Sequence, residues 1–384
     1  MKTFYLDYNA TTPLDPAVRD AMLPYLGDVF GNPSSVHHVG RRARALLDDA
    51  RDRVARVWAC KPSEVIFTSG GTESTNLAIF GAARLLRDKG RHIITSSVEH
   101  DAVLQSYEYL AAKEGFEVTY LPVSSEGFVS VESLMAAIRP DTVLVSLMAA
   151  NNENGAIQPV AELGKACRER GVLFHTDAVQ WFGKEPFADI HQFNADLVSI
   201  CAHKFHGPKG AGALYVRSPL HPDPILFGGG HENERRAGTE NLATIIGFAE
   251  ATDRFVKTPV FPKEHLLALT NRLVNFIQKL GPKLAVLRSP RECRLANTLA
   301  FTVPRGDSIS LLAGLDLEGI CASSGSACSA GSLEPSHVML ALGVPKEEAN
   351  SLVRFSLGRE STLSEVEHVE RVLPKIIARV TGAW

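Results

Sequence analysis

The sequence predicts an α/β protein with a mostly parallel sheet and a second, smaller domain. Apolar runs of strand length alternate with segments of helical periodicity over residues 65–255. The apolar runs are nearly continuous, which is typical of strands covered on both faces of a parallel sheet. The periodicity then breaks at KTPVFPKE, residues 257–264, where two prolines indicate a domain boundary.

Six apolar runs are expected to form strands of the first domain, at residues 65–68, 92–96, 117–122, 142–148, 172–176 and 196–200. Helix signals lie between them: residues 72–87 follow a Gly-Gly turn, and residues 160–170 are opened by Pro159 and closed by Gly171. Open parallel sheets bind ligands outside the carboxyl ends of their strands. We therefore expect the chemistry directly after these runs.

The second domain is predicted to be α+β. It follows a helix at 242–255 and contains helices at 264–280 and 308–316, strands at 298–303 and 352–355, and a terminal helix from Ser364. We expect residues 15–256 to form the large domain and residues 1–14 with 257–384 to form the small one.

The composition and net charge of the chain limit the kinds of binding partner that we expect. Forty basic and 43 acidic residues among 384 give a formal net charge of −3, and no basic tract indicates nucleic acid or an anionic membrane. The start of the chain has no apolar signal core, and no segment has the length and apolarity of a membrane span, so we expect a cytoplasmic protein that acts on small molecules. Six cysteines are too sparse for a disulfide scaffold, and Cys60, Cys167 and Cys293 are expected to be buried apolar side chains.

Lys204 is the first candidate for chemistry. It directly follows an apolar strand in SICAHKFHGPKG, residues 199–210. A lysine whose charge is destabilised is an amine nucleophile that can form a Schiff base with an aldehyde cofactor such as pyridoxal phosphate. Asp177, in HTDAVQ after another strand, could keep the pyridine nitrogen protonated, and Gln180 could hydrogen-bond the ring oxygen. The alternative for Asp177 is a cap of the following turn.

Two further strand ends complete this hypothesis. TSGG, residues 68–71, leads into a helix whose free amide groups suit a phosphate dianion, although a Gly-Gly pair is often only a tight turn. His100 follows the strand at 92–96 and could stack on the cofactor and move protons, including the proton of a thiol; its alternative is a helix cap.

A reactive thiol is predicted in the second domain. Cys328 lies among small residues in ASSGSACSAGSLEPSH, residues 322–337, where a loop is expected that could carry sulfur from one site to another. Arg354, on a predicted strand in VRFSLGR, could hold an amino-acid carboxylate through two hydrogen bonds or form a structural ion pair.

Together these residues resemble the cysteine desulfurases, in the branch of the nitrogen-fixation and housekeeping iron–sulfur enzymes. The resemblance covers nearly the whole chain and includes these segments, in order: YLDYNATTPLD from Tyr5, FGNPSSVHHVG from Phe30, TSGGTESTN from Thr68, EHDAVL from Glu99, AANNENG from Ala149, HTDAVQ from His175, AHKFHGPKG from Ala202, RRAGTEN from Arg235, SSGSACSAGSLEPSH from Ser323 and VRFSLGR from Val353.

The resemblance implies a fold-type I pyridoxal 5'-phosphate enzyme, a homodimer with a seven-stranded large-domain sheet and a smaller α+β domain that carries the cysteine loop. It places these residues around the cofactor: Gly71, Thr72, His100, Asn152, Asp177, Gln180, Cys201, His203, Lys204 and, from the neighbouring subunit, Thr239. Asn152 and Arg354 would also hold the substrate carboxylate. Cys201 stands where many relatives have a phosphate-binding serine, and a thiol is a weaker donor.

The implied reaction converts L-cysteine to L-alanine, with Lys204, His100 and Cys328 as catalytic residues and a persulfide on Cys328. A scaffold protein of iron–sulfur assembly would accept the sulfur; no structural metal is expected, and Cys328 could contact a transient iron–sulfur cluster. Selenocysteine lyase or another aminotransferase-like reaction is the alternative, and a protein that keeps the fold without the cofactor is a third.

Overall fold

The computed structural model describes residues 2–325 and 334–382. Its large sheet has seven strands in the order β2-β8-β7-β6-β5-β3-β4. Their bounds are β2 (Val65–Thr68), β3 (His92–Ser96), β4 (Glu117–Leu121), β5 (Thr142–Ser146), β6 (Leu173–Asp177), β7 (Leu197–Cys201) and β8 (Gly212–Val216). β8 pairs antiparallel with both of its neighbours, β2 and β7, and the other neighbouring pairs of this sheet are parallel. The predicted α/β fold with a mostly parallel sheet is confirmed.

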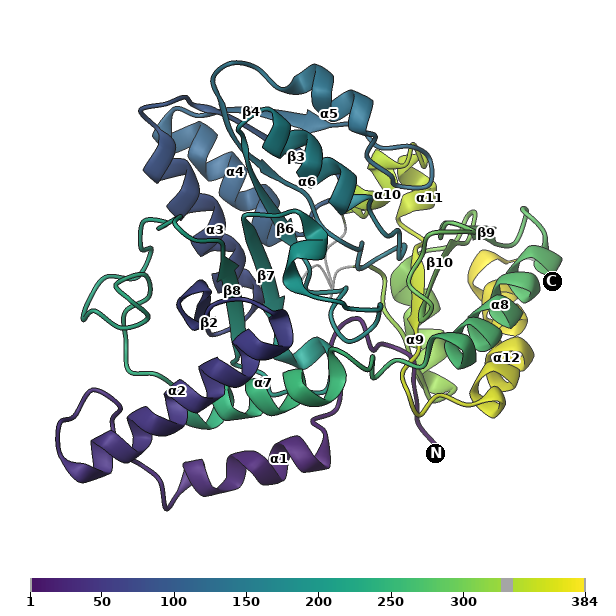
Figure 1. Cartoon of the computed structure of the whole chain (residues 1–384). Helices are drawn as coiled ribbons and strands as arrows, with labels where there is room; N and C mark the ends of the chain where they lie inside the picture. The colour runs from purple at the N-terminus through teal and green to yellow at the C-terminus, as the bar shows by residue number, and fades with distance from the viewer. Residues whose placement is uncertain (1, 326–333, 383–384) are drawn as a thin grey trace.

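Helices cover both faces of this sheet (Figure 1). They are α1 (Pro16–Met22), α2 (His38–Trp58), α3 (Gly71–Leu86), α4 (Asp101–Glu114), α5 (Val131–Ala137), α6 (Val160–Glu169) and α7 (Leu242–Phe255), with short 3-10 turns η1 (Leu23–Leu26), η2 (Pro62–Glu64), η3 (Ile190–Phe193) and η4 (Ala202–Lys204). Successive strand residues point to opposite faces. Ile93 and Leu144 accordingly pack with α3 and α4, whereas Ile94 and Val145 belong to the core on the other face.

A smaller sheet lies beside the large one (Figure 1). Its antiparallel strands are β9 (Val286–Leu287), β10 (Thr298–Thr302) and β12 (Val353–Ser356), and its helices are α8 (Lys263–Leu280), α9 (Ser308–Leu317), α10 (His337–Ala341), α11 (Lys346–Ala349) and α12 (Leu363–Thr381). The beginning of the chain joins this part, because β1 (Phe4–Tyr5) pairs in parallel with β11 (Ile320–Cys321).

Residues 6–15, which we call the N-terminal strap, connect the small sheet to the large one. The amide of Tyr8 donates to the carbonyl of Ser356 in β12 at 3.0 Å. The amides of Thr12 and Asp15 donate to the carbonyls of His203 and His206 just after β7, each at 3.0 Å. The strap therefore crosses the region that follows the carboxyl end of β7, where sequence analysis expects the chemistry.

Two features differ from the sequence-based expectations or go beyond them. The strand β8 has no counterpart among the six predicted runs. Cys167 is buried as expected, but Cys60 is only partly buried and Cys293 is exposed, so the prediction of a buried Cys293 is wrong. Cys293 lies in a turn with a left-handed φ of 51°, which presents its side chain to solvent. No described helix combines the length and apolarity that a membrane crossing requires.

Replacement of Leu197 by Ala is expected to destabilise the fold. Leu197 is fully buried in β7, the strand that leads to Lys204. Truncating a buried leucine removes apolar contacts and leaves a cavity, so L197A should lower the free energy of unfolding by about 2–5 kcal/mol. Urea unfolding of the cofactor-free protein measures this. L317A is the matched control, because Leu317 is 66% exposed on α9 and should change stability by less than about 0.5 kcal/mol. Equal losses in the two variants would contradict the packing described for β7.

Candidate active site

A cavity of about 180 Å³ lies at the carboxyl edge of the large sheet. Its lining comes from the segments that follow β2, β3, β5, β6 and β7, as expected for parallel strands whose ends meet at one edge. The lining residues are Gly71, Thr72, His100, Ala102, Met148, Ala150, Asn152, Asp177, Val179, Gln180, Cys201, His203 and Lys204. The structure thus brings together nine of the residues that sequence analysis singled out.

Lys204 enters the cavity from the short turn that follows β7. Its Nζ donates hydrogen bonds to the carbonyls of Asn9 and Ala10 in the N-terminal strap, at 2.6 and 2.8 Å. Burial lowers the pKa of Lys204, because an ammonium group loses water solvation there. The nearby Arg354 guanidinium lowers it further, against the opposing effects of Cys201, Asp7 and Asp177. This environment favours the unprotonated amine, which is the nucleophilic form.

Asp177 and His100 come from the ends of two other strands. Asp177 is the last residue of β6, is 8% exposed, and accepts a hydrogen bond from the amide of Val179 at 2.9 Å through Oδ1. Burial raises the pKa of Asp177, while His100 and Lys204 lower it. His100 caps α4, and its Nδ1 accepts from the amide of Ala102 at 3.0 Å. The cap was the alternative considered for His100, and the same ring also lines the cavity.

The beginning of α3 also lines the cavity, through Gly71 and Thr72. The first amide groups of a helix have no partner within the helix and carry a partial positive charge, so this end suits an anion. Gly71, the first residue of α3, has no room for a side chain: a Cβ there would lie 2.8 Å from Cγ2 of Val179. The backbone can therefore come close to a ligand at this point.

His203 and Cys201 are both uncharged beside this anion site at neutral pH. Burial lowers the pKa of His203 to about 4, and its Nδ1 lies 3.1 Å from the hydroxyl oxygen of Thr11. Burial raises the pKa of the Cys201 thiol to about 11. The residue that departs from the usual serine is therefore a protonated thiol in the wall of the cavity.

Sequence reasoning missed two residues at the base of the site, Asn9 and Lys184. The carbonyl of Asn9 accepts from both Lys204 and Gln180, and its Oδ1 accepts from Lys184 at 2.7 Å. Its Nδ2 donates to the carbonyl of Asn152 at 3.1 Å. Asn9 lies in the motif YLDYNATTPLD, which was recognised only as part of the resemblance. No comparable signal marks Lys184, which resembles any surface lysine until the fold buries it.

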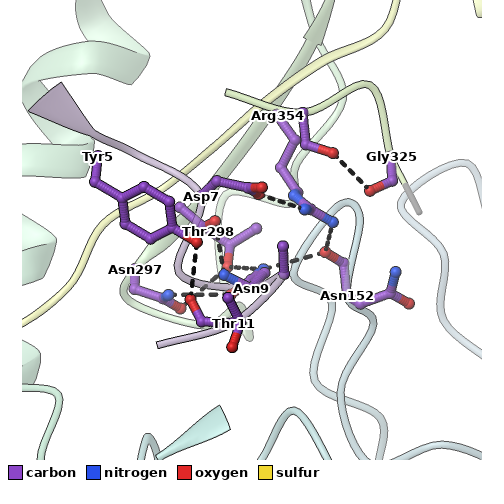
Figure 2. A network of polar contacts seen from close by, with 12 residues as sticks. Tyr5, Asp7, Asn9, Thr11, Asn152, Asn297, Thr298, Gly325 and Arg354 are labelled. Carbon is purple, nitrogen blue, oxygen red and sulfur yellow. Dashed lines mark hydrogen bonds and ion pairs between the residues drawn. The ribbon is translucent and has the colours of Figure 1, made fainter. Parts of the chain in front are cut away.

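Arg354 is not among the residues that line the cavity, but it contacts Asn152, which is. Figure 2 shows its guanidinium between Asp7 and Asn152. It is 1% exposed in β12, where its guanidinium donates to Oδ1 of Asp7 at 2.7 Å and to the carbonyl of Asn152 at 2.9 Å. Nε has no hydrogen-bond partner in the described part of the chain. The ion pair foreseen as an alternative is therefore present, and Arg354 also contacts Asn152, which faces the cavity.

Two further predicted residues are not among those that line the cavity in the described part of the chain. Thr239 is exposed, outside the residues that line this cavity. Cys328 lies outside the described residues. The last described residue before it, Gly325, approaches Glu153 so closely that a Cβ would lie 2.9 Å from a carboxylate oxygen. On the far side of the gap, the hydroxyl of Ser336 donates to the same carboxylate.

These features fit pyridoxal 5'-phosphate. A buried carboxylate, a buried amine of lowered pKa and a helix beginning face one cavity, and they match the ring nitrogen, the aldehyde and the phosphate of that cofactor. Among the described residues there is no group of His, Cys, Asp and Glu side chains that could hold a metal ion.

Comparison with known proteins gives the same assignment. Residues 4–369 match the family described as Aminotransferase class-V. The chain is 47% identical to a protein named "Cysteine desulfurase IscS" from Dictyoglomus turgidum, over 98% of this chain and 95% of the relative. It is 46% identical to a protein of the same name from Methanosarcina thermophila, over 99% of this chain and 93% of the relative.

Solved structures of related proteins support the same family assignment. A "NIFS-like protein" superimposes with a TM-score of 0.90 at 37% identity and covers 98% of this chain and 100% of its own. A structure titled "SspA in complex with cysteine" has a TM-score of 0.82 at 34% identity, covering 94% of this chain and 100% of its own. The chain therefore belongs to the class-V aminotransferase family, as a cysteine desulfurase that depends on pyridoxal 5'-phosphate.

Proposed function

We propose that the chain converts L-cysteine to L-alanine and keeps the sulfur as a persulfide on Cys328. The observation that carries the proposal is the meeting of Lys204, Asp177 and the beginning of α3 at one cavity, beside the buried guanidinium of Arg354. A relative whose structure is titled as a complex with cysteine supports the substrate. The alternatives, selenocysteine lyase and another aminotransferase-like reaction, are not favoured by the named relatives.

Residues of the cavity wall would hold the cofactor at three points. Lys204 binds the aldehyde carbon, Asp177 pairs with the protonated ring nitrogen, and the amides of Gly71 and Thr72, with His203 and the Cys201 thiol, contact the phosphate. Gln180 donates to the ring oxygen. The bound cofactor supplies an electron sink that lowers the cost of removing the substrate α-proton. When the substrate amine has taken the place of Lys204 on the cofactor, Nζ of Lys204 is free to accept that proton. The lowered pKa of Lys204 suits this role as a base.

His100 is assigned to stacking over the cofactor and to proton transfer. Its Nδ1 accepts the capping hydrogen bond, so in the neutral ring the proton resides on Nε2. Nε2 is then a proton donor within the cavity. To deprotonate a thiol, the ring would have to change tautomer or release the cap.

The substrate carboxylate is assigned to Arg354 and Asn152. The guanidinium already lies against the carbonyl of Asn152, and its Nε–H has no hydrogen-bond partner among residues 2–325 and 334–382. Arginine presents its donors in a planar fork that matches a carboxylate. Asp7 holds the opposite side of the guanidinium and keeps it in the plane that faces Asn152.

Cys328 is assigned as the sulfur acceptor. Ser323 exchanges backbone hydrogen bonds with Arg354, and Cys328 comes three residues after Gly325, so a chain of about 3.6 Å per residue allows the thiol to reach a substrate held by Arg354. The Cys328 thiolate attacks the substrate sulfur, the S–S bond forms as the C–S bond breaks, and the electron pair returns to the substrate carbon skeleton, which gains a proton. L-cysteine and one thiol thus give L-alanine and one persulfide, so no outside oxidant is needed.

The proposal includes a homodimer in which the partner copy supplies Thr239 to each cavity. Large apolar side chains on two separate stretches of sequence are strongly exposed: Phe30 by 80%, Val36 by 87% and Phe227 by 84%. Exposure of several large apolar groups is typical of an interface. Residues 15–256 would form the cofactor-binding domain, and residues 1–14 with 257–384 the domain that carries the cysteine loop.

Sulfur would pass from Cys328 to a scaffold protein of iron–sulfur cluster assembly in the cytoplasm. The IscS name shared by several relatives supports this destination. The proposed function involves no structural metal and no nucleic acid. The one metal group that it includes is a transient iron–sulfur cluster bound at Cys328.

Replacement of Cys328 by Ala should abolish alanine formation from L-cysteine and leave cofactor binding intact. Only the sulfur acceptor is lost, because the residues that hold the cofactor are unchanged. Alanine release, cofactor absorbance and the mass of the Cys328 peptide after incubation with L-cysteine measure this; the wild-type peptide should gain one sulfur atom. C293A, at an exposed cysteine, is the control and should keep full activity. Normal alanine release by C328A would refute the role of Cys328.

Covalent capture of the cofactor by Lys204 should persist to lower pH than capture by an ordinary lysine. Only the unprotonated amine reacts, so capture falls as the pH drops through the pKa of the amine. Burial lowers that pKa from an ordinary value of about 10.4, so the midpoint should lie below it. Cofactor-free protein is mixed with pyridoxal phosphate across a pH series, reduced with borohydride and weighed by mass spectrometry.

The same measurement includes two variants as controls. K204A should lose the rapid adduct, and K209A should keep it, since Lys209 is exposed on the turn after Lys204. An adduct on K204A with the midpoint of the wild-type protein would show that another amine carries the cofactor.

A further inference from the structure

We propose that Lys184 is a positioning residue that fixes the side-chain amide of Gln180 with its N–H facing the cofactor cavity. This inference rests on the proposed role of Gln180 as a donor to the cofactor. Lys184 is 3% exposed and lies in the turn that follows Gln180. Its Nζ donates to Oε1 of Gln180 at 2.6 Å and to Oδ1 of Asn9 at 2.7 Å.

Lys184 has an unusual environment for a lysine. In the part of the chain that the structure describes, no carboxylate lies within ion-pair distance of it; the adjacent Glu185 pairs with Lys263 at 2.7 Å. Burial of an ammonium group without a carboxylate is costly, and burial lowers the pKa of Lys184 well below its usual range. A neutral amine still carries two N–H bonds. Lys184 can therefore donate to both acceptors in either protonation state.

The orientation of Asn9 is determined by its other contacts. Its Nδ2 donates to the carbonyl of Asn152 at 3.1 Å and to the hydroxyl oxygen of Thr298 at 2.9 Å. Both donors of the amide are thus used on one side, and Oδ1 must face Lys184. Asn9 therefore serves as a fixed acceptor that holds the Lys184 amine in place.

The amine in turn determines the orientation of Gln180. An ammonium group has donors only, so Oε1 of Gln180 faces it and the flipped amide would oppose donor to donor. A neutral amine could accept through its lone pair, but the flipped amide would then turn Oε1 toward the carbonyl oxygen of Asn9, so both contacts favour the same orientation. Nε2 then donates one hydrogen to the carbonyl of Asn9 at 2.9 Å. The second hydrogen of Nε2 remains. Since Gln180 lines the cavity, this hydrogen is available to an acceptor there, such as the ring oxygen of the cofactor.

A purely structural role would have different consequences. Nζ also lies 5.3 Å from the ring centroid of Phe261, so the side chain packs in the interior as well as donating hydrogen bonds. If packing were its only role, removing the amine would affect stability without depending on Gln180. The two roles are separated by whether the effect passes through Gln180.

The experiment is a double-mutant cycle on the cofactor-loaded enzyme with K184M, Q180A and K184M/Q180A. Methionine keeps the unbranched apolar stem against Phe261 and removes the donor. K184M should weaken cofactor binding about three- to tenfold, as expected for one misdirected hydrogen bond, and shift the absorbance maximum in the same direction as Q180A. In the Q180A background, K184M should add no further change in either quantity. Equal effects of K184M in both backgrounds would overturn the proposal.

Controls separate the possible failures. K263M removes a partly exposed lysine from its ion pair with Glu185, outside the cavity, and should leave the absorbance maximum unchanged. If Q180A itself changes neither affinity nor absorbance, the assigned role of Gln180 fails; if Q180A changes them and K184M does not, only the role of Lys184 fails.

Should the cofactor-free K184M melt far below the wild-type protein, K184Q replaces it in the cycle. K184Q keeps an amide donor and should recover part of the lost affinity; no recovery by K184Q would count against the role of Lys184.

Discussion

The hydrogen bonds of Asn9 are the constraint on which the geometry of the site depends. This residue is 1% exposed, and its backbone amide donates to Oγ of Ser356 in the small sheet at 2.9 Å. Its carbonyl accepts from Lys204, and its side chain contacts Asn152 and Lys184. A buried polar group without partners is costly, so a shift of either sheet would break several of these bonds at once. The N-terminal strap therefore fixes the amine after β7 relative to the guanidinium on β12.

The balance of buried charge explains why the cavity suits amine chemistry. Three basic side chains, Lys184, Lys204 and Arg354, lie in or beside it. Asp7 and Asp177 act to raise the pKa of Lys204, Glu185 acts to raise that of Lys184, and Asp7 forms an ion pair with Arg354. Arg354 keeps its charge through an ion pair with Asp7, because a guanidinium does not deprotonate in proteins. The two lysines instead contact carbonyl and amide oxygens, which accept hydrogen bonds from an amine without stabilising a full positive charge as a carboxylate would. In this site the arginine therefore carries the lasting positive charge, and the two lysines serve as amines that donate hydrogen bonds.

Sequence reasoning succeeded where the position along a strand determines the position in space. Asp177 and Lys204 were identified because each follows an apolar run, and parallel strands bring such positions to one edge. Asn9 was missed as an individual residue because its contacts with Gln180 and Lys184 join positions 171 and 175 residues apart, and the burial of Lys184 depends on the same kind of long-range contact, which no local pattern records. The exposed Cys293 was misjudged for a related reason: its side chain is presented by a left-handed turn, and residue type alone does not reveal that backbone conformation. The error for Lys184 runs in the opposite direction: residue type alone suggests an exposed lysine, but the fold buries it.

The strand β12 connects two tasks of the proposed reaction. Arg354 points its guanidinium toward Asn152 (Figure 2). The backbone of Arg354 pairs with that of Ser323, which precedes the segment that contains Cys328. On the other side of that segment, Ser336 returns to Glu153, the residue after Asn152. Both ends of the cysteine segment are thus held by the groups that border the substrate position. The backbone pairing that places Arg354 on β12 therefore also sets where the described chain ends before residues 326–333, and the contact of Ser336 with Glu153 sets where it resumes, so both flanks depend on the same part of the fold as the proposed carboxylate site.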